Sequence, residues 1–277
     1  MPRNTDPIAV SVWTRPPRRA RRGQPPLSRD QIVAAAIELL DAEGMDGLSM
    51  RRLGERLGAG ATSSYWYVAN KDELLELAVD QVMGEMDIPD LAEAGWRTTA
   101  RACAEEYRAV LLRHPWVIGL MGARPTIGPN AMRMGERMIG ALAAAGFTGV
   151  ELAFASELLS SHAVGSATIA AAMHQASDRA GKHPNELVAE LDPYLRGLQD
   201  EYPGYIAVWY ATKGIDMDKL HEDGFGYGLE RLLDGLEIRL HSPDDALGAP
   251  EPDGIPGAHG TSVSAPSEPG SSGSSRA

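Results

Sequence analysis

The sequence predicts an all-α fold. Aromatic residues make up only 6% of the 277 residues, and Ala and Leu supply most of the apolar surface, which favours helices over sheets. Apolar residues also recur at helical spacing through most of the chain, in segments that begin at capping residues and are separated by short breaks. The hydrophobic content of 43% is sufficient for one large core or two smaller ones.

Both ends of the chain differ in composition from the part between them. Residues 1–26 are rich in proline and arginine, and residues 242–277 are rich in Pro, Gly and Ser. Such segments cannot bury enough apolar surface to become ordered. We therefore expect a disordered basic arm over 1–26 and a disordered tail over 242–277.

The first helix is predicted by clear start and stop signals. Ser28 and Gln31 form the pattern of a capping box, and Gly44 is a stop signal. The apolar residues between them fall on one helical face: Ile32, Val33, Ala36, Ile37 and Leu40. We expect this helix to support the shorter helices that follow it.

Three further segments follow the first helix. Ser49 is placed to cap a short second helix with Leu53 and Leu57 facing inward, and a glycine-containing turn at 58–60 leads to a third segment over 61–67. Asn70 and Glu73 form a second capping-box pattern, which opens a fourth helix over 71–86. Two short helices joined by a turn and braced by a longer helix form a helix-turn-helix pattern, a motif used for binding DNA.

The side chains of the third segment fit that interpretation. Thr62, Ser63, Tyr65 and Tyr67 carry hydroxyl groups, which can donate to phosphates and reach base edges. The alternative is a polar surface on an ordinary three-helix unit.

Charged residues around the third segment support the same interpretation. Arg51 and Arg52 begin the preceding helix, and Lys71 lies in the first turn of the next, where a phosphate can also meet helix N-terminal amides. The formal net charge of −12 is unevenly distributed, because residues 1–73 carry 11 Lys/Arg against 9 Asp/Glu and the remainder carries 15 against 29. This asymmetry suits a nucleic-acid-facing N-terminal part. The arginine-rich run over 15–22 is either a solvated arm or an additional phosphate contact.

Residues 27–75 resemble the DNA-binding domain of the TetR family. The segments that carry the resemblance are 34–40, 44–53 and 65–75, the last with an aromatic pair, a valine and an Asn-Lys step into a capped helix. The resemblance implies that 61–67 is the recognition helix and that Trp66 packs inward. It places base contacts at Arg51, Ala61, Thr62 and Ser63, and phosphate contacts at Ser49, Tyr65 and Lys71. Ala61 and Tyr67 depart from the tetracycline repressors, so their operator sequence is not carried over.

The rest of the folded chain resembles the regulatory domain of the tetracycline-repressor branch. The matching segments are 96–112, 122–125, 128–131 and 225–237. We therefore expect a helix-turn-helix domain over 27–77 and a helical ligand-binding and dimerisation domain over 78–241. The resemblance also implies that two helices pair with their symmetry mates in a four-helix bundle.

Two sequence patterns suggest which helices form that homodimer. A helix over 152–173 is dominated by small residues, and a helix over 222–241 carries a stripe at helical spacing. The stripe is expected at the dimer interface: Phe225, Leu229, Leu232, Leu233 and Leu236. The alternative is that both helices pack inside the core of one subunit.

A helical regulatory domain commonly holds its ligand between helices. The candidate pocket residues are Cys103, Tyr107, Trp116, Leu120, Met121, Met132, Met138 and Phe147. The resemblance would place a metal-binding histidine at Leu120 and an acidic residue that assists metal binding near Ile169. Both positions are apolar in this sequence. We therefore expect a small hydrophobic organic effector, with no cofactor and no metal.

Several other classes are disfavoured. The chain has no apolar run of membrane-spanning length and no secretory signal, and its one cysteine, Cys103, permits no intramolecular disulfide. We expect a cytoplasmic, ligand-responsive transcriptional repressor that binds double-stranded operator DNA and no membrane. Two alternatives are an enzyme, since several histidines lie among carboxylates, and a TetR-like ligand-binding module that has lost specific DNA binding.

Overall fold

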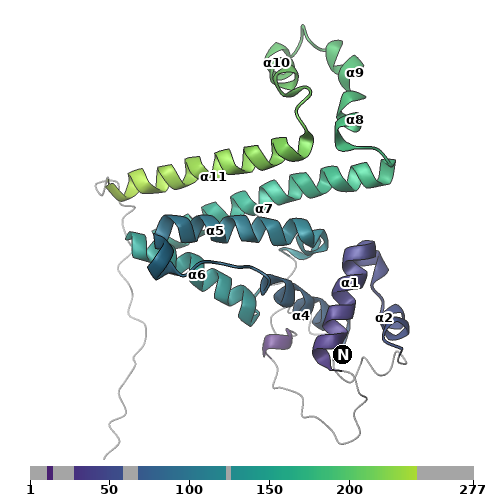
Figure 1. The fold of residues 1–277 in the computed structure, drawn as a ribbon, viewed down its shortest axis with the longest axis vertical. Coiled ribbons are helices and arrows are strands. Elements are labelled where there is room, and N and C mark those ends of the chain that lie inside the picture. Colours follow the sequence, from purple (N-terminus) through teal and green to yellow (C-terminus); the bar gives the residue numbers. More distant parts are fainter. Residues whose placement is uncertain (1–10, 15–27, 59–67, 123–125, 242–277) are drawn as a thin grey trace, which may run out of the picture. The chain divides into compact units, whose positions relative to one another are not determined.

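The computed structural model describes residues 11–14, 28–58, 68–122 and 126–241. These residues form helices and no strands, in agreement with the predicted all-α fold (Figure 1). None of the described helices is both long and apolar enough to cross a membrane.

The N-terminal head consists of three described helices. They are α1 (Arg29–Gly47), α2 (Met50–Arg56) and α4 (Lys71–Met83). The capping box at Ser28 and Gln31 is present in both directions, with N···O distances of 3.1 and 2.8 Å. Gly44 lies inside the assigned span of α1 at a φ of +67°, so the regular helix is interrupted there. A residue with a Cβ atom would be strained in that conformation.

The head has an apolar centre formed by the inward faces of these helices. Ile32, Leu40, Leu53 and Leu74 are fully buried, and Val68 joins them from the segment before α4. Asn70 accepts the N–H of Glu73, as predicted, while the Glu73 carboxylate accepts the N–H of Ala69. The fourth helix therefore begins at Lys71, and it ends three residues earlier than predicted.

The body is formed by four longer helices. They are α5 (Leu91–Arg113), α6 (Pro129–Ala145), α7 (Gly149–Ala180) and α11 (Met217–His241), with the 3-10 helix η2 (Pro115–Leu120) between α5 and α6. α5 packs against α6, α7 and α11, and α7 also packs against α11 (Figure 1). Their shared core contains Cys103, Met138, Leu159 and Leu233.

Ion pairs lock α5 to α11 at the edge of this core. Arg97 donates to Glu230, Asp234 and Glu237 over 2.6–3.0 Å. The Arg97 guanidinium, and after it that of Arg231, lowers the pKa of the Asp234 carboxyl. One cation shared by three carboxylates fixes the register of the two helices more firmly than a single exposed pair would.

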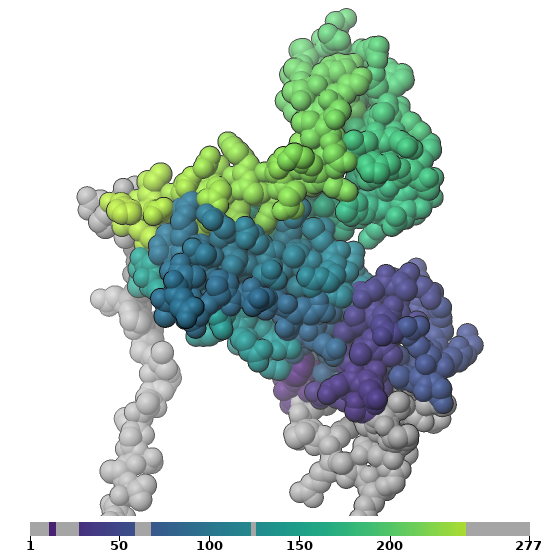
Figure 2. Space-filling model, viewed as in Figure 1, coloured from purple at the N-terminus to yellow at the C-terminus, as the bar shows by residue number. Residues whose placement is uncertain are grey.

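A small lobe joins α7 to α11. It contains α8 (Pro184–Ala189), α9 (Asp192–Arg196) and α10 (Pro203–Thr212), which extend beyond the ends of the two long helices (Figures 1 and 2). Asp192 is paired with Arg196 and Lys213 at its base. The lobe lies between the end of α7 at Ala180 and the start of α11 at Met217.

Part of the arm expected to be disordered is instead ordered. The 3-10 helix η1 (Val12–Thr14) lies against α4, and the Glu76 carboxylate accepts both the Ser11 hydroxyl at 2.7 Å and the Val12 N–H at 2.9 Å. Ser11 is 4% exposed, and Trp13 packs against the core of the head. The expectation for 1–26 is therefore corrected at 11–14, where two apolar side chains and a carboxylate partner compensate for the ordering of the backbone.

Candidate DNA-binding head and ligand cavities

The N-terminus of α2 presents one arginine to solvent. The Ser49 hydroxyl caps the helix by accepting the N–H of Arg52 at 3.2 Å. Arg51 lies on the outer side, where its side chain is 78% exposed and, among the described residues, pairs with Glu55, one turn along the same helix. An exposed pair of this kind is weak, so the Arg51 guanidinium can exchange its partner for a base or a phosphate at little cost.

The neighbouring arginine has a structural role. Arg52 donates to the Glu43 carboxylate at 2.6 Å and to the Gly47 carbonyl at 3.1 Å, and so ties the start of α2 to the end of α1. The two adjacent arginines therefore differ in function, which their sequence alone does not show.

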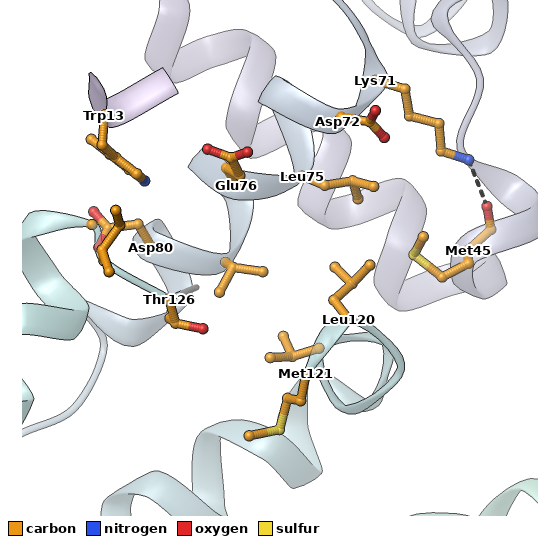
Figure 3. A pocket seen from close by; sticks show the side chains of 14 residues that line it. Trp13, Met45, Lys71, Asp72, Leu75, Glu76, Asp80, Leu120, Met121 and Thr126 are labelled. Carbon is orange, nitrogen blue, oxygen red and sulfur yellow. Dashed lines mark hydrogen bonds between the residues drawn. The ribbon is translucent and has the colours of Figure 1, made fainter. Parts of the chain in front are cut away.

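The side chain of Lys71 points into the head. Its ammonium group donates to the carbonyl oxygen of Met45 at 3.1 Å (Figure 3) and to that of Leu48 at 2.8 Å, both after the interruption of α1. These two carbonyl oxygens have no N–H donor from a continuing helix, and the ammonium of Lys71 takes the place of that donor. Lys71 therefore joins α4 to the end of α1, and its predicted phosphate contact stays a prediction.

The predicted recognition helix lies outside the described residues. It includes Ala61, Thr62, Ser63, Tyr65 and Tyr67, for which the predicted contacts remain expectations. The described elements on either side are the C-terminus of α2 and the N-terminus of α4, so this segment connects two parts of the head whose positions are fixed.

A polar cluster around the buried ring of His114 connects the head to the body. Asp41, on α1, accepts the indole N–H of Trp116 at 2.7 Å and lies 2.7 Å from Nδ1 of His114. The other ring nitrogen of His114 lies 3.2 Å from Glu85, just after α4. His114 is 5% exposed and directly follows α5. The cluster therefore joins α1, the end of α4 and the start of η2 through directional contacts.

A second polar contact joins α4 to α6. Asp80, 5% exposed, accepts the backbone N–H groups of Asn130 and Ala131 at 2.9 and 3.1 Å. A carboxylate at a helix N-terminus is favourable because it satisfies unpaired N–H groups and meets the positive end of the helix dipole. A Cβ atom at Gly128 would lie 2.2 Å from this carboxylate, so the close approach requires glycine.

A cavity of about 280 Å³ lies beside these contacts, at the junction of head and body. α4 forms one wall, η2 and residues 126–128 form another, and Trp13 and Met45 complete it from η1 and α1 (Figure 3). Its apolar lining is Trp13, Met45, Leu75, Val79, Val117, Leu120, Met121 and Ile127. The polar side chains on its wall are Lys71, Asp72, Glu76, Asp80 and Thr126.

The eight residues predicted to line a ligand pocket do not share one cavity. Leu120 and Met121 line the junction cavity. Cys103, Met138 and Phe147 are buried in the core of the body, whereas Met132 is 59% exposed. The prediction of a single pocket made of all eight is therefore wrong, because most of them fill the space between helices themselves.

The two remaining predicted pocket residues join packed regions. Tyr107 packs against the cores of both head and body, and burial raises the pKa of its hydroxyl. The indole N–H of Trp116 donates a hydrogen bond to Asp41. Burial likewise raises the pKa of the Cys103 thiol to about 11, which makes that side chain a buried, weakly acidic core residue.

Sequence reasoning missed Trp13, Asp80 and Gly128 at the junction. A signal was present for Trp13, because an apolar pair at 12–13 is unusual within a proline- and arginine-rich segment. The signal for Asp80 was weaker: it is a carboxylate on a part of α4 where most residues are apolar.

Two further cavities lie elsewhere in the described structure. One of about 160 Å³ lies between the end of α4 and α6, and another of about 480 Å³ lies at the base of the α8–α10 lobe. Among the described residues, no group of three or more His, Cys, Asp or Glu side chains is arranged to hold a metal ion.

The predicted dimer stripe faces the interior of the subunit. Phe225, Leu229, Leu233 and Leu236 are at most 9% exposed and pack against the other helices of the body, with Leu232 at the edge of the same core. The four buried side chains are therefore unavailable to a partner subunit. The structure agrees with the alternative interpretation, in which this stripe packs inside the core of one subunit.

A different face of the same two helices is exposed. On α7 it carries Phe154, Leu158, Ser161, Gly165 and Ile169, which follow one another at helical spacing. On α11 it carries Tyr227 and Ile238, which are 68% and 67% exposed. Small residues lie at the middle of the α7 stripe and large apolar residues lie at its ends, an arrangement that allows close approach of another helix.

Comparisons with known proteins agree with this architecture. Residues 32–78 match the family described as bacterial regulatory proteins, tetR family, and residues 88–240 match the tetracyclin repressor-like C-terminal domain. An HTH-type transcriptional regulator from Saccharopolyspora erythraea is 42% identical over 204 residues, covering 74% of this chain and 84% of that protein. The transcriptional repressor DrrR1 from Streptomyces coeruleorubidus is 36% identical over 230 residues, covering 82% and 83%.

A solved structure shows the same fold. ActR from Streptomyces coelicolor, in complex with actinorhodin, aligns with a TM-score of 0.62 at 30% identity, covering 76% of this chain and 99% of that one. A helix-turn-helix head on a larger helical domain defines a DNA-binding transcriptional regulator. The chain belongs to the TetR family, as both matching domains and the close relatives show.

Proposed function

We propose that this regulator is a homodimeric repressor that a small organic effector releases from its operator. The observation that carries the proposal is the contrast within α2, the helix that precedes the predicted recognition segment in the sequence: Arg51 is exposed, whereas Arg52 is bonded to Glu43. The similarity to DrrR1, a named repressor, and to ActR, which was solved with actinorhodin, supports both parts of it.

The proposed DNA contacts fall into two groups. Arg51, Ala61, Thr62 and Ser63 contact bases, and Ser49, Tyr65 and Tyr67 contact phosphates or lie beside them. Lys71 also contacts a phosphate in this proposal, and its ammonium holds the end of α1 against α4. It thereby positions the helices that flank the recognition segment. Regulation through DNA, rather than catalysis, is the activity proposed for this chain.

The proposed dimer uses the exposed faces of α7 and α11. The stripe from Phe154 to Ile169 would lie against its symmetry mate, with Ser161 and Gly165 at the closest approach. A head of about 50 residues reads a short half-site, so pairing two heads on a palindrome supplies the specificity that one head lacks. The hydrophobic effector proposed for the body acts by favouring dimers whose heads are wrongly spaced for the two half-sites.

DNA binding by the purified protein tests this proposal. Fluorescence anisotropy should show tight binding to a fragment from upstream of its own coding sequence, and at least about a thousandfold weaker binding to a scrambled fragment of equal length and composition. Affinity should fall steeply as salt rises. Equal affinity for the two fragments would contradict the proposal and favour a ligand-binding module that lacks specific DNA recognition.

The exposed arginine provides a sharper version of the same test. Arg51→Ala should weaken operator binding by about 1–3 kcal/mol and relax base preference, since it removes an exposed side chain that exchanges its weak pair with Glu55 for DNA at little cost. Arg133→Ala, an exposed arginine on α6 of the body, is the matched control and should leave operator affinity unchanged. If both variants bind alike, α2 does not face the operator.

A further inference from the structure

The cavity at the base of the α8–α10 lobe has the features of a ligand site. Its volume of about 480 Å³ exceeds the 280 Å³ of the junction cavity, and it lies where the lobe meets α7 and α11 (Figure 1). We propose that this cavity binds a neutral, mainly apolar organic molecule of two or three rings. The proposal concerns the lobe alone, so it goes beyond the proposed function and does not depend on how the head recognises DNA.

The walls of this cavity come from elements that are far apart in the sequence. Met173 lies near the end of α7, Val188 on α8, Trp209 on α10 and Leu220 on α11. Each of these four residues is half-buried. A ligand among them would contact the lobe and both long helices at the same time, and it would bury apolar surface on several of its sides.

The size of the cavity and its access to solvent suit a small organic molecule. A volume of about 480 Å³ lies within the range of known ligand sites, and it accommodates a naphthalene ring system with an attached phenyl ring. Leu191 and Ile215 line the cavity and are 49% and 38% exposed, so a ligand can reach it from solvent. Met173 and Met217 also line it, and such flexible side chains adapt to ligands of differing outline.

The charged side chains on the cavity wall pair with each other. Within the described part of the chain they are Asp192 and Lys213, whose carboxylate oxygen and ammonium nitrogen lie 3.0 Å apart. Arg196, with a side chain that is 64% exposed, pairs with the same carboxylate. A charged ligand would therefore lose its hydration in this cavity without meeting an unpaired opposite charge on the wall.

The uncharged polar side chains on the wall also have partners. The Asn185 amide donates to the Ile215 carbonyl at 3.2 Å and accepts the N–H of Met217 at 2.9 Å. The Thr212 hydroxyl donates to the carbonyl of Trp209 at 3.0 Å. Because these bonds connect the elements of the wall to one another, they favour a ligand that binds through apolar contact rather than through hydrogen bonds.

Fluorescence titration of the full chain without DNA tests the class of ligand. The probes are N-phenyl-1-naphthylamine, which is neutral, and 8-anilino-1-naphthalenesulfonate, which has the same rings and carries a sulfonate. The neutral probe should bind at least about tenfold more tightly, because a buried sulfonate would find no unpaired cation on the wall. Equal or tighter binding of the sulfonate, or no saturable binding of the neutral probe up to its solubility limit, would overturn the proposal.

A pair of alanine variants locates the binding to this cavity. Ala189→Trp, on the wall at the end of α8, should fill part of the space and weaken the neutral probe at least about tenfold. Ala207→Trp, at an exposed position of α10 outside the cavity lining, should leave the affinity within about twofold of the wild type. Equal affinities of Ala189→Trp and the wild type would place the probe elsewhere and refute the assignment.

Hydrogen exchange of the wild-type chain gives a second measurement, which needs no variant. The neutral probe should slow the exchange of amides at 185–192 and 209–220, and it should leave those of α4 and η2, at 71–83 and 115–120, unchanged. Protection confined to α4 and η2 would place the probe in the junction cavity. Protection at the lobe that weakens as the protein concentration rises would mean that a second copy of the chain covers the cavity. Either result would contradict the proposal.

The failure of this inference is distinguishable from the failure of the proposed function. Titration without DNA measures only the binding of the probe, and operator binding without a probe measures only the regulator. Specific operator binding together with absent probe binding would overturn the lobe site and leave the proposed function standing.

Discussion

The core of the body and the junction below it are held together in different ways. In the body, α5, α7 and α11 share a continuous apolar core, and Arg97 shares its charge among three carboxylates of α11. At the junction, an apolar cluster that continues from the head into α5 and η2 and directional contacts at Asp41, His114 and Asp80 hold head to body beside a cavity. A densely packed core transmits displacement as a unit, whereas a joint that borders unfilled space has room for two arrangements.

The same contrast appears where helices approach closely. In the body, a Cβ atom at Gly228 would lie 2.4 Å from the ring of His162, which stacks on Phe225 with centroids 5.1 Å apart. The guanidinium of Arg108 also lies over the ring of Phe225, and it donates hydrogen bonds to Glu222 and Ser166. α7 and α11 are therefore closely packed around Gly228, while the junction retains about 280 Å³.

The largest expected effect is the removal of a buried side chain from the body. Leu233→Ala should lower the free energy of unfolding by about 2–5 kcal/mol, because Leu233 is fully buried and a rigid core cannot close the resulting void. Chemical denaturation at one fixed protein concentration measures this change. Leu191→Ala, the same substitution at a residue that is 49% exposed, should cost less than about 1 kcal/mol. Comparable losses in both variants would show that the body is not tightly packed.

The next effect concerns the junction. Asp80→Ala should lower the free energy of unfolding by about 1–3 kcal/mol, because it leaves the N–H groups of Asn130 and Ala131 without their acceptor. Asp80→Asn keeps an oxygen acceptor and should lose less. Thermal unfolding of the two variants compares them directly. If Asn is as damaging as Ala, the charge rather than the hydrogen bonds stabilises this contact.

The smallest effect compares two glycines on α11. Gly228→Ala should destabilise the fold by about 1–2 kcal/mol, because the clash with His162 outweighs the better helix propensity of alanine. Gly226→Ala meets nothing within 4 Å and should be neutral or stabilise by up to about 1 kcal/mol. Chemical denaturation of the two variants measures the free energy of unfolding of each. A stabilising Gly228→Ala would mean that α7 and α11 can separate at that point.

The sequence predicted the helices best where local chemistry decides the structure. The starts of α1, α2 and α4 follow from Ser28, Ser49 and Asn70, each of which caps a helix through its own side chain. The bodies of the helices follow from apolar spacing, which reports that a face is buried. Spacing alone does not say what covers that face, so the stripe on α11 was assigned to a partner subunit although α5 and α7 cover it.

The site was less predictable because its residues meet through tertiary contacts. Lys71 has the position of a phosphate contact in the sequence, yet the interruption at Gly44 leaves carbonyl oxygens of Met45 and Leu48 that attract its ammonium. Similarly, apolar residues such as Cys103 and Met138 look the same in sequence whether they fill a core or line a pocket. Only their packing in three dimensions separates the two cases.

Hydrogen exchange with and without operator DNA tests the central claim most directly. The claim is that head and body are coupled through a movable junction next to a rigid body. Operator binding should therefore change the protection of amides in α4 and η2, at 71–83 and 115–120. It should leave the protection of amides in the buried stretches of α5 and α11, at 99–111 and 225–236, unchanged. Changes concentrated in α5 and α11, with α4 and η2 unaffected, would contradict the account.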